Sequence, residues 1–149
     1  MKTVLFVCTG NTCRSPMAEA IARHLLDEGK VPGQGREVFV ASAGLGAWDG
    51  SPTSHETLET LRGRGIHFDG HSKRLTPEMI RKATLVLTMT RSHLMGARAL
   101  VGGEAHQDKV QMLDSGGDLE DPIGMGQIAY DALALRLEQV LPGRLRELL

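Results

Sequence analysis

The feature that most constrains this fold is an apolar strand, of the kind buried inside a parallel sheet, that leads almost directly into a helix. Thr3 to Val7 (TVLFV) is a continuous apolar run, which is typical of a strand covered on both faces of a parallel sheet. Ser15 then stands where an N-cap is expected, and Pro16 stands at the first helical position, where its missing N–H costs nothing. A strand joined so closely to a helix predicts a βα unit.

The rest of the 149-residue chain repeats this alternation of strand and helix. Further strands are predicted at residues 37–41, 83–89 and 109–113. Further helices are predicted at 54–62, after Thr76-Pro77, at 92–100 and from about Gln127, with Pro142-Gly143 ending or kinking the last one. The order predicts a single doubly wound α/β domain over residues 1–149, with a four-stranded parallel sheet flanked by helices.

Composition excludes several classes of protein. The 17 Lys and Arg nearly balance the 18 Asp and Glu, so the net charge of −1 provides no basic field for nucleic acid or anionic lipid. No apolar run is long enough for a signal peptide or a membrane span. Two cysteines cannot build a disulfide scaffold or a four-cysteine zinc site. We therefore expect a cytoplasmic protein without nucleic-acid or membrane partners.

The chemistry is expected in the loop between the first strand and its helix, because ligands of such sheets bind beyond the carboxyl ends of the strands. Backbone N–H groups of this loop can form an anion-binding nest at the positive end of the helix. Gly10 permits a positive φ and Asn11 tolerates one, while the Arg14 guanidinium can donate two hydrogen bonds to an oxyanion. The predicted phosphate-binding residues are Thr9, Gly10, Asn11, Thr12, Cys13 and Arg14.

Cys8 stands at the edge of this nest, where the same field favours its thiolate form and makes it nucleophilic. The loop is therefore predicted to cradle a phosphate group with a thiolate directed at phosphorus. The alternative is an ordinary βα turn in which Cys8 is a buried residue at the end of the strand.

The segment VLFVCTGNTCRSPMAEA resembles the N-terminal signature of the low-molecular-weight protein tyrosine phosphatases. Three further elements follow in the order of that family and at nearly its spacing: SAG at 42–44, His71, and the pair Asp121-Pro122. The resemblance thus extends over the whole chain.

The resemblance implies a two-step mechanism without a metal or another cofactor. Cys8 would form a cysteinyl-phosphate while Arg14 and the loop amides hold the phosphate oxygens, and the Ser15 hydroxyl would stabilise the thiolate. Asp121 would protonate the leaving atom and then take a proton from water. The family also implies that Asn11, Ser42 and His71 form a hydrogen-bonded set that supports the loop.

Cys13 has two interpretations. A second cysteine at this place in the family can form a reversible disulfide with the nucleophile, here Cys8, which would protect it from further oxidation. Cys13 could equally be a plain packed residue.

The preferred phosphorylated residue is suggested by Thr12, because typical tyrosine-specific members carry a bulky aliphatic residue there and aromatics after the Asp-Pro pair. This chain reads CTGNTCRSP and DPIG, and so resembles the branch that acts on phosphoarginine in proteins. The Thr12 hydroxyl can accept a guanidinium N–H, as can the Asp121 carboxylate. A neutral substitution at Thr12 is the alternative, and Trp48 could form an aromatic wall for phosphotyrosine.

Other functions remain open on the same loop. Arsenate reductase is a rival on this fold, but it passes a disulfide along further cysteines, and none follows Cys13 here. A phosphoresidue-binding module is disfavoured because Cys8, Arg14, Ser15 and Asp121 are all retained, whereas a thiol redox sensor needs only the two cysteines. Phosphorylated proteins are the expected partners, and a monomer is favoured although the oligomeric state is not fixed.

Overall fold

The computed structural model describes residues 1–33, 37–102 and 105–149, and its centre is one parallel sheet. The strands pair in the order β2-β1-β3-β4, and each pair is parallel. Their bounds are Lys2–Cys8 for β1, Val38–Gly44 for β2, Leu85–Thr88 for β3 and Val110–Met112 for β4. The predicted four-stranded parallel sheet is confirmed.

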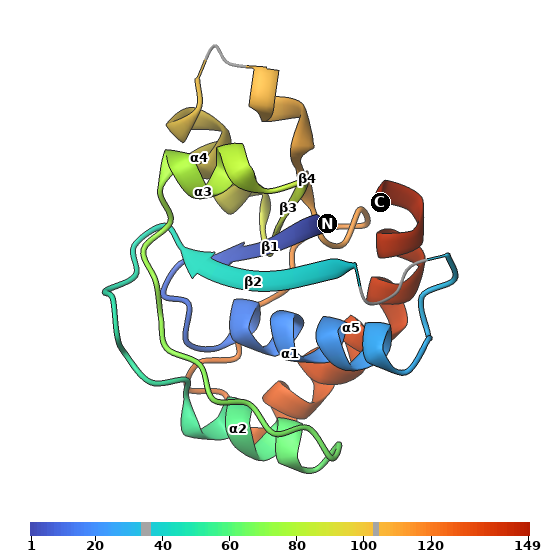
Figure 1. Cartoon of the computed structure of the whole chain (residues 1–149). Coiled ribbons are helices and arrows are strands. Elements are labelled where there is room, and N and C mark those ends of the chain that lie inside the picture. The colour runs from blue at the N-terminus through green and yellow to red at the C-terminus, as the bar shows by residue number, and fades with distance from the viewer. Residues whose placement is uncertain (34–36, 103–104) are drawn as a thin grey trace.

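Helices cover both faces of this sheet (Figure 1). The first group contains α1 (Arg14–Asp27), α5 (Gln127–Leu148) and, packed against both, α2 (His55–Arg62). The second group contains α3 (Pro77–Lys82) and α4 (Arg91–Leu100), and a short 3₁₀ helix, η1 (Ala105–Lys109), leads into β4. The doubly wound arrangement is therefore confirmed. In the described part of the chain, no helix is both long and apolar enough to cross a membrane.

The central strand β1 divides the core in two, because side chains alternate between the faces of a strand. Val4, Phe6 and Cys8 pack into the apolar cluster formed with α1 and α5. Leu5 and Val7 pack into the cluster on the other face, with α3 and α4. The alternation thus places Cys8 at the carboxyl end of the sheet, on the side of α1.

The first helix begins two residues earlier than predicted. Cys13, not Ser15, is the N-cap of α1, and its side chain makes no capping hydrogen bond. The Ser15 hydroxyl is instead in contact with the Cys8 sulfur and the Asn11 side chain. Pro16 lies in the first turn of α1, where its missing N–H leaves no intrahelical hydrogen bond unmade.

The prediction that Pro142-Gly143 could end the last helix is wrong. Helix α5 continues through Pro142 to Leu148. A proline inside a helix costs about 3 kcal/mol, but Leu141 and Leu145 on either side of it are fully buried. Each buried leucine contributes about 1.5–3 kcal/mol, so packing against the core holds the last turns in place.

Candidate active site

The loop between β1 and α1 encloses a cavity of about 200 Å³ at the carboxyl edge of the sheet. The structure brings the predicted nucleophile, phosphate-binding residues and general acid together here, although Asp121 is more than a hundred positions from the loop. The cavity is lined by Cys8, Thr9, Gly10, Asn11, Thr12, Cys13, Arg14, Asp121 and Ile123.

Two hydrogen-bond donors point at the Cys8 sulfur, which is almost fully buried. The Asn11 backbone N–H donates to Sγ over 3.2 Å, and the Ser15 Oγ lies 2.8 Å from it. Since Ser15 Oγ already accepts a hydrogen bond from the Asn11 side chain, its own proton is free to point at the sulfur. The sulfur thus has two potential hydrogen-bond donors beside it, which suits the thiolate that the proposed mechanism uses.

The Asn11 side chain ties the loop to three other segments. Its Nδ2 donates to Ser15 Oγ over 2.8 Å and to Ser42 Oγ over 2.9 Å, and its Oδ1 accepts the Lys73 backbone N–H over 2.9 Å. Asn11 is buried and has a φ of 55°, the only positive φ of a non-glycine residue among those described. The three hydrogen bonds hold a backbone conformation that most residues avoid.

Glu19 ends this network and was not predicted from the sequence. Its Oε1 accepts a 2.6 Å hydrogen bond from the Ser42 hydroxyl. Burial raises the pKa of Glu19, against the opposing effects of the Ser42 hydrogen bond and the positive charges of Lys73 and Arg23. The available signal was a carboxylate standing between apolar neighbours in the first helix.

His71 does not join the supporting set that the resemblance implied. Its side chain is exposed, and its backbone pairs with Pro52 in an isolated antiparallel bridge. Among the hydrogen bonds of the described residues, none joins the His71 side chain to Asn11 or Ser42. The pairing with Pro52 leaves the side chain of His71 in solvent, so the contact to Asn11 comes from the backbone of Lys73 instead.

Arg14 and Asp121 meet across the cavity. Arg14 is 7% exposed, and its Nη1 donates to the Leu119 carbonyl over 3.1 Å. Its Nη2 lies 3.5 Å from Asp121 Oδ2, while Asp121 Oδ1 accepts the Ile123 N–H over 3.1 Å. The Asp121 side chain is 46% exposed. The carboxylate thus reaches the loop in this conformation and remains accessible to a ligand.

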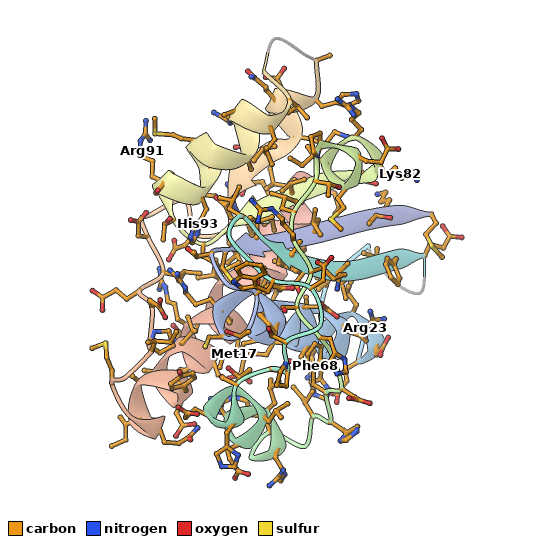
Figure 2. The ribbon with its side chains drawn as sticks, turned by 90° about the vertical axis from the view of Figure 1, so that its left-hand side faces the viewer. Met17, Arg23, Phe68, Lys82, Arg91 and His93 are labelled. Carbon is orange, nitrogen blue, oxygen red and sulfur yellow. The ribbon has the colours of Figure 1, made fainter. Side chains whose placement is uncertain are left out.

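His93 is a second residue near the cavity that was not predicted. It projects from the start of α4 toward the end of β1 (Figure 2), and its Nε2 lies 2.8 Å from Thr9 Oγ1. Burial, followed by the positive charge of Arg14, lowers the pKa of His93 to about 4. The imidazole is therefore neutral at physiological pH. Its position could have been anticipated, since the helix after β3 begins at the same sheet edge as the loop.

The end of β2 passes directly under the loop at Gly44. A Cβ on this glycine would lie 2.4 Å from the Thr9 carbonyl oxygen and 3.0 Å from the Asn11 nitrogen. Two backbone hydrogen bonds fix the approach, from Leu45 N–H to the Cys8 carbonyl over 2.9 Å and from Gly46 N–H to the Thr9 carbonyl over 3.0 Å. Glycine is required here because any side chain would displace the loop.

Cys13 is buried behind the loop with a free thiol. Its Sγ lies 3.6 Å from the Tyr130 hydroxyl and 3.8 Å from Thr12 Oγ1. Burial raises the pKa of Tyr130, as does its hydrogen bond with Cys13. Tyr130 is thus a neutral phenol that can donate to the Cys13 sulfur.

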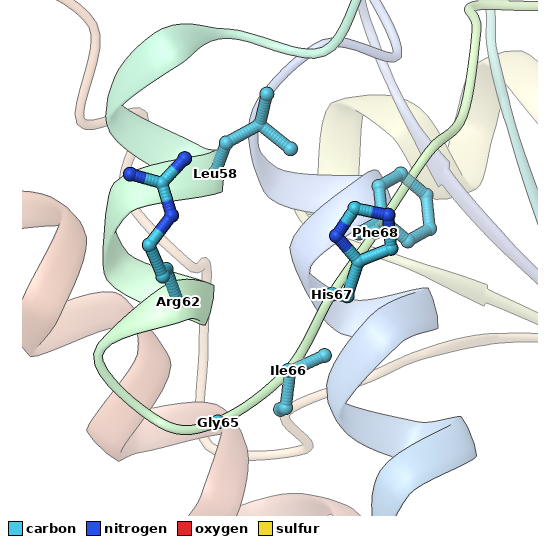
Figure 3. A pocket seen from close by; sticks show the side chains of 6 residues that line it. All are labelled: Leu58, Arg62, Gly65, Ile66, His67 and Phe68. Carbon is cyan, nitrogen blue, oxygen red and sulfur yellow. The ribbon is translucent and has the colours of Figure 1, made fainter.

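A different cavity of about 240 Å³ lies between α2 and residues 65–68 (Figure 3). It is lined by Leu58, Arg62, Gly65, Ile66, His67 and Phe68. No residue of the loop between β1 and α1 lines it, so it is separate from the cavity at the sheet edge.

A buried cysteine that accepts a backbone N–H, with an arginine and a carboxylate lining the same cavity, fits a cysteine-dependent phosphoryl-transfer enzyme. Residues 3–149 match the family of the low molecular weight phosphotyrosine protein phosphatase. The chain belongs to this family, whose members are protein phosphatases.

Two relatives and one solved structure illustrate the range of that family. The protein-arginine-phosphatase of Bacillus subtilis is 36% identical over 93% of this chain and 91% of its own length. A low molecular weight protein-tyrosine-phosphatase of Streptomyces coelicolor is 33% identical over 95% and 90%. The structure of a YwlE arginine phosphatase mutant with a phosphorylated active-site serine has a TM-score of 0.87, with 33% identity over 97% of this chain and 93% of its own.

Proposed function

We propose that this protein hydrolyses phosphoarginine in proteins through a cysteinyl-phosphate intermediate. The observation that carries the proposal is a polar threonine, Thr12, in a catalytic cavity whose described lining residues include no aromatic side chain. Trp48, the one aromatic candidate for a wall, does not line the cavity and is 82% exposed. A phosphotyrosine ring would find aliphatic contact only at Ile123.

The polar groups at the cavity suit a guanidinium. Thr12 is half-buried, and the only hydrogen-bond contact of its hydroxyl among the described residues is the long one to the Cys13 sulfur. Its oxygen is therefore available to accept an N–H of phosphoarginine. The exposed Asp121 carboxylate can accept another. An aliphatic residue in place of Thr12 would leave a substrate donor unpaired, at a cost of about 1–3 kcal/mol where it is buried.

The first chemical step transfers the phosphoryl group to the enzyme. Cys8 Sγ attacks phosphorus and forms the S–P bond, while the P–N bond of phosphoarginine breaks. Asp121 donates its proton to the leaving nitrogen, so that the target protein departs with an unmodified arginine side chain. Arg14 and the backbone N–H groups of the loop hold the three equatorial oxygens, on which charge is spread in the transition state.

The second step releases phosphate. Asp121, now a carboxylate, takes a proton from a water that attacks phosphorus, and the S–P bond breaks. The hydrogen bonds from Ser15 and the Asn11 N–H stabilise the departing thiolate of Cys8. The phosphorylated active-site serine in the related arginine phosphatase structure supports a covalent phosphoenzyme at this position.

Cys8 and Cys13 carry a second, reversible function in this proposal. Peroxide oxidises the Cys8 thiolate to a sulfenic acid, and the Cys13 thiol then attacks that sulfur and releases water to form a disulfide. Both cysteines line the same cavity, which supports the pairing. Peroxide treatment should abolish activity and a thiol reductant should restore it, whereas a Cys13→Ala variant should lose activity irreversibly.

The protein is proposed to act on phosphorylated proteins as a monomer in the cytoplasm. The two free thiols are suited to a reducing compartment.

The experiment that tests substrate choice measures kcat/KM for phosphoarginine and phosphotyrosine in one matched peptide, with the Cys8→Ser variant as the blank. A preference for phosphoarginine that falls about tenfold in Thr12→Ile is expected. A preference for phosphotyrosine would assign the protein to the tyrosine-specific members, which the Streptomyces coelicolor relative represents. Equal activity in the wild type and the blank would overturn the mechanism.

A further inference from the structure

A second pocket, of about 230 Å³, lies beside the catalytic cavity and has no role in the chemistry described above. It is formed between the loop that carries Asp121 and helix α5. Its apolar walls are Leu119, Pro122, Met125, Ala129, Ala132 and Leu133. A small, mainly apolar pocket of this kind suits a single side chain rather than a whole cofactor.

The two cavities adjoin at Asp121, which lines both. One oxygen of its carboxylate faces Arg14 in the catalytic cavity. The chain then places Ile123 at the catalytic cavity and Met125 at the second pocket, so two residues from one short loop serve the two spaces. A polypeptide that leaves the catalytic cavity across Asp121 therefore meets the second pocket next.

We infer that this pocket is a substrate subsite: it binds an apolar side chain of the target protein within two residues of the phosphorylated residue. The inference rests on the proposed protein phosphatase function, but not on which phosphorylated residue is preferred. An extended chain advances about 3.3 Å per residue. A substrate residue one or two positions from the phosphorylated residue can therefore reach past the Asp121 side chain, which both cavities share, into the second pocket.

The charges around the pocket disfavour an acidic occupant, and its apolar walls favour an apolar one. Arg136 lines the pocket, but its guanidinium is engaged by Asp114 Oδ2 over 3.0 and 2.7 Å. Glu120 is exposed at the pocket and would repel an acidic neighbour. Met125 is 63% exposed without a ligand, and a thioether side chain adapts readily to different apolar partners. An aliphatic or aromatic substrate residue would cover it.

The test compares phosphopeptides that differ only in leucine or serine at one of the four positions −2, −1, +1 and +2. Each pair is made with phosphoarginine and again with phosphotyrosine. At one or more positions, kcat/KM for the leucine peptide should exceed that for the serine peptide by about tenfold, as half-burial of a leucine side chain implies. A leucine-to-serine ratio near one at all four positions would overturn the inference.

Two variants locate the preference. Ala132→Phe fills the pocket, and Met125→Ser removes an exposed wall without touching the core. Both should reduce the leucine-to-serine ratio to near one, whereas Leu135→Ala, which is exposed on α5 outside the pocket, should leave it unchanged. A ratio that survives both pocket variants would place the apolar contact elsewhere and overturn the inference.

The use of both phosphoarginine and phosphotyrosine peptides tests the subsite independently of the proposed phosphoarginine preference. A leucine preference with phosphotyrosine alone would contradict the phosphoarginine proposal and still support the subsite. A phosphoarginine preference without any effect of the flanking residue would do the reverse.

Discussion

The side of the cavity that holds the proposed nucleophile is anchored by buried, hydrogen-bonded side chains, whereas the side that carries the proposed acid is exposed. Cys8, Asn11 and Ser15 are each at most 3% exposed, and they are connected to β2 and to residue 73. Asp121 is 46% exposed and is held by one ion pair and one local hydrogen bond. The comparison teaches that the proposed phosphate site is built by the fold, while the proposed acid and substrate contacts beside it belong to an exposed loop.

The largest expected effect comes from breaking the buried side with Asn11→Ala. This change removes three hydrogen bonds and leaves alanine in a left-handed conformation. We expect kcat/KM to fall about 10³-fold and the free energy of unfolding to fall by about 3 kcal/mol. Phosphatase kinetics and urea denaturation measure the two effects.

Asn11→Gly separates the hydrogen bonds from the backbone conformation, because glycine accepts a positive φ without strain. It should regain part of the stability but little of the activity. Full activity in Asn11→Gly would show that the side-chain network has no part in shaping the loop.

In contrast to Asn11→Ala, the substitution Asp121→Asn on the exposed side should reduce activity with little loss of stability. The amide cannot donate or accept the proton that the mechanism requires, so kcat should fall about 10²-fold. Stability should change by less than about 1 kcal/mol, because the ion pair with Arg14 is half-exposed and Arg14 keeps its hydrogen bond to the Leu119 carbonyl. Thermal unfolding and steady-state kinetics on one preparation would check this split, and a large loss of stability would contradict it.

The pH dependence of stability tests the burial of His93 beside the loop. Because its pKa in the folded state is about 4 and that in the unfolded chain is about 6.5, the unfolded chain binds the additional proton. Stability should therefore fall as the pH drops from 6.5 toward 4, by up to about 3 kcal/mol from this residue. His93→Gln should show a shallower decline in urea denaturation from pH 8 to 4, and identical curves would exclude the effect.

The smallest effect is expected from Ser42→Ala, at the edge of the buried network. The change leaves the Glu19 carboxylate without its hydroxyl donor and Asn11 with one fewer acceptor. A loss of about 1–2 kcal/mol in stability and up to about tenfold in kcat/KM should follow. Ser92→Ala, at an exposed position on α4, is the matched control and should be neutral.

The sequence alone predicted the structure where neighbouring residues determine it. The apolar run of β1 and the closely following helix predicted the sheet, and the loop between them contains all the predicted phosphate-binding residues in one short segment. Asp121 could be assigned only through the resemblance to a family, because nothing local distinguishes it from an Asp-Pro turn.

Errors arose where distant contacts override a local preference. Ser15 has the form of an N-cap, but its hydroxyl is taken by Cys8 and Asn11. His71 lies two residues from the true contact, the backbone N–H of Lys73, which carries no sequence signal. The position of His93 depends on the relation between two strands, since its partner Thr9 is 84 residues away.

Because Cys8 is the last residue of the central strand, its backbone is fixed by the sheet itself, paired in register with Gly44 and bonded to Leu45. The sulfur of the proposed nucleophile is therefore carried on a backbone that the sheet holds in place. For protein engineering, the consequence is that one segment of the chain positions the sulfur and another is proposed to contact the substrate. Changes at the exposed residues Ile123 and Met125 are expected to redirect the proposed activity to other substrates, while the sulfur keeps its position.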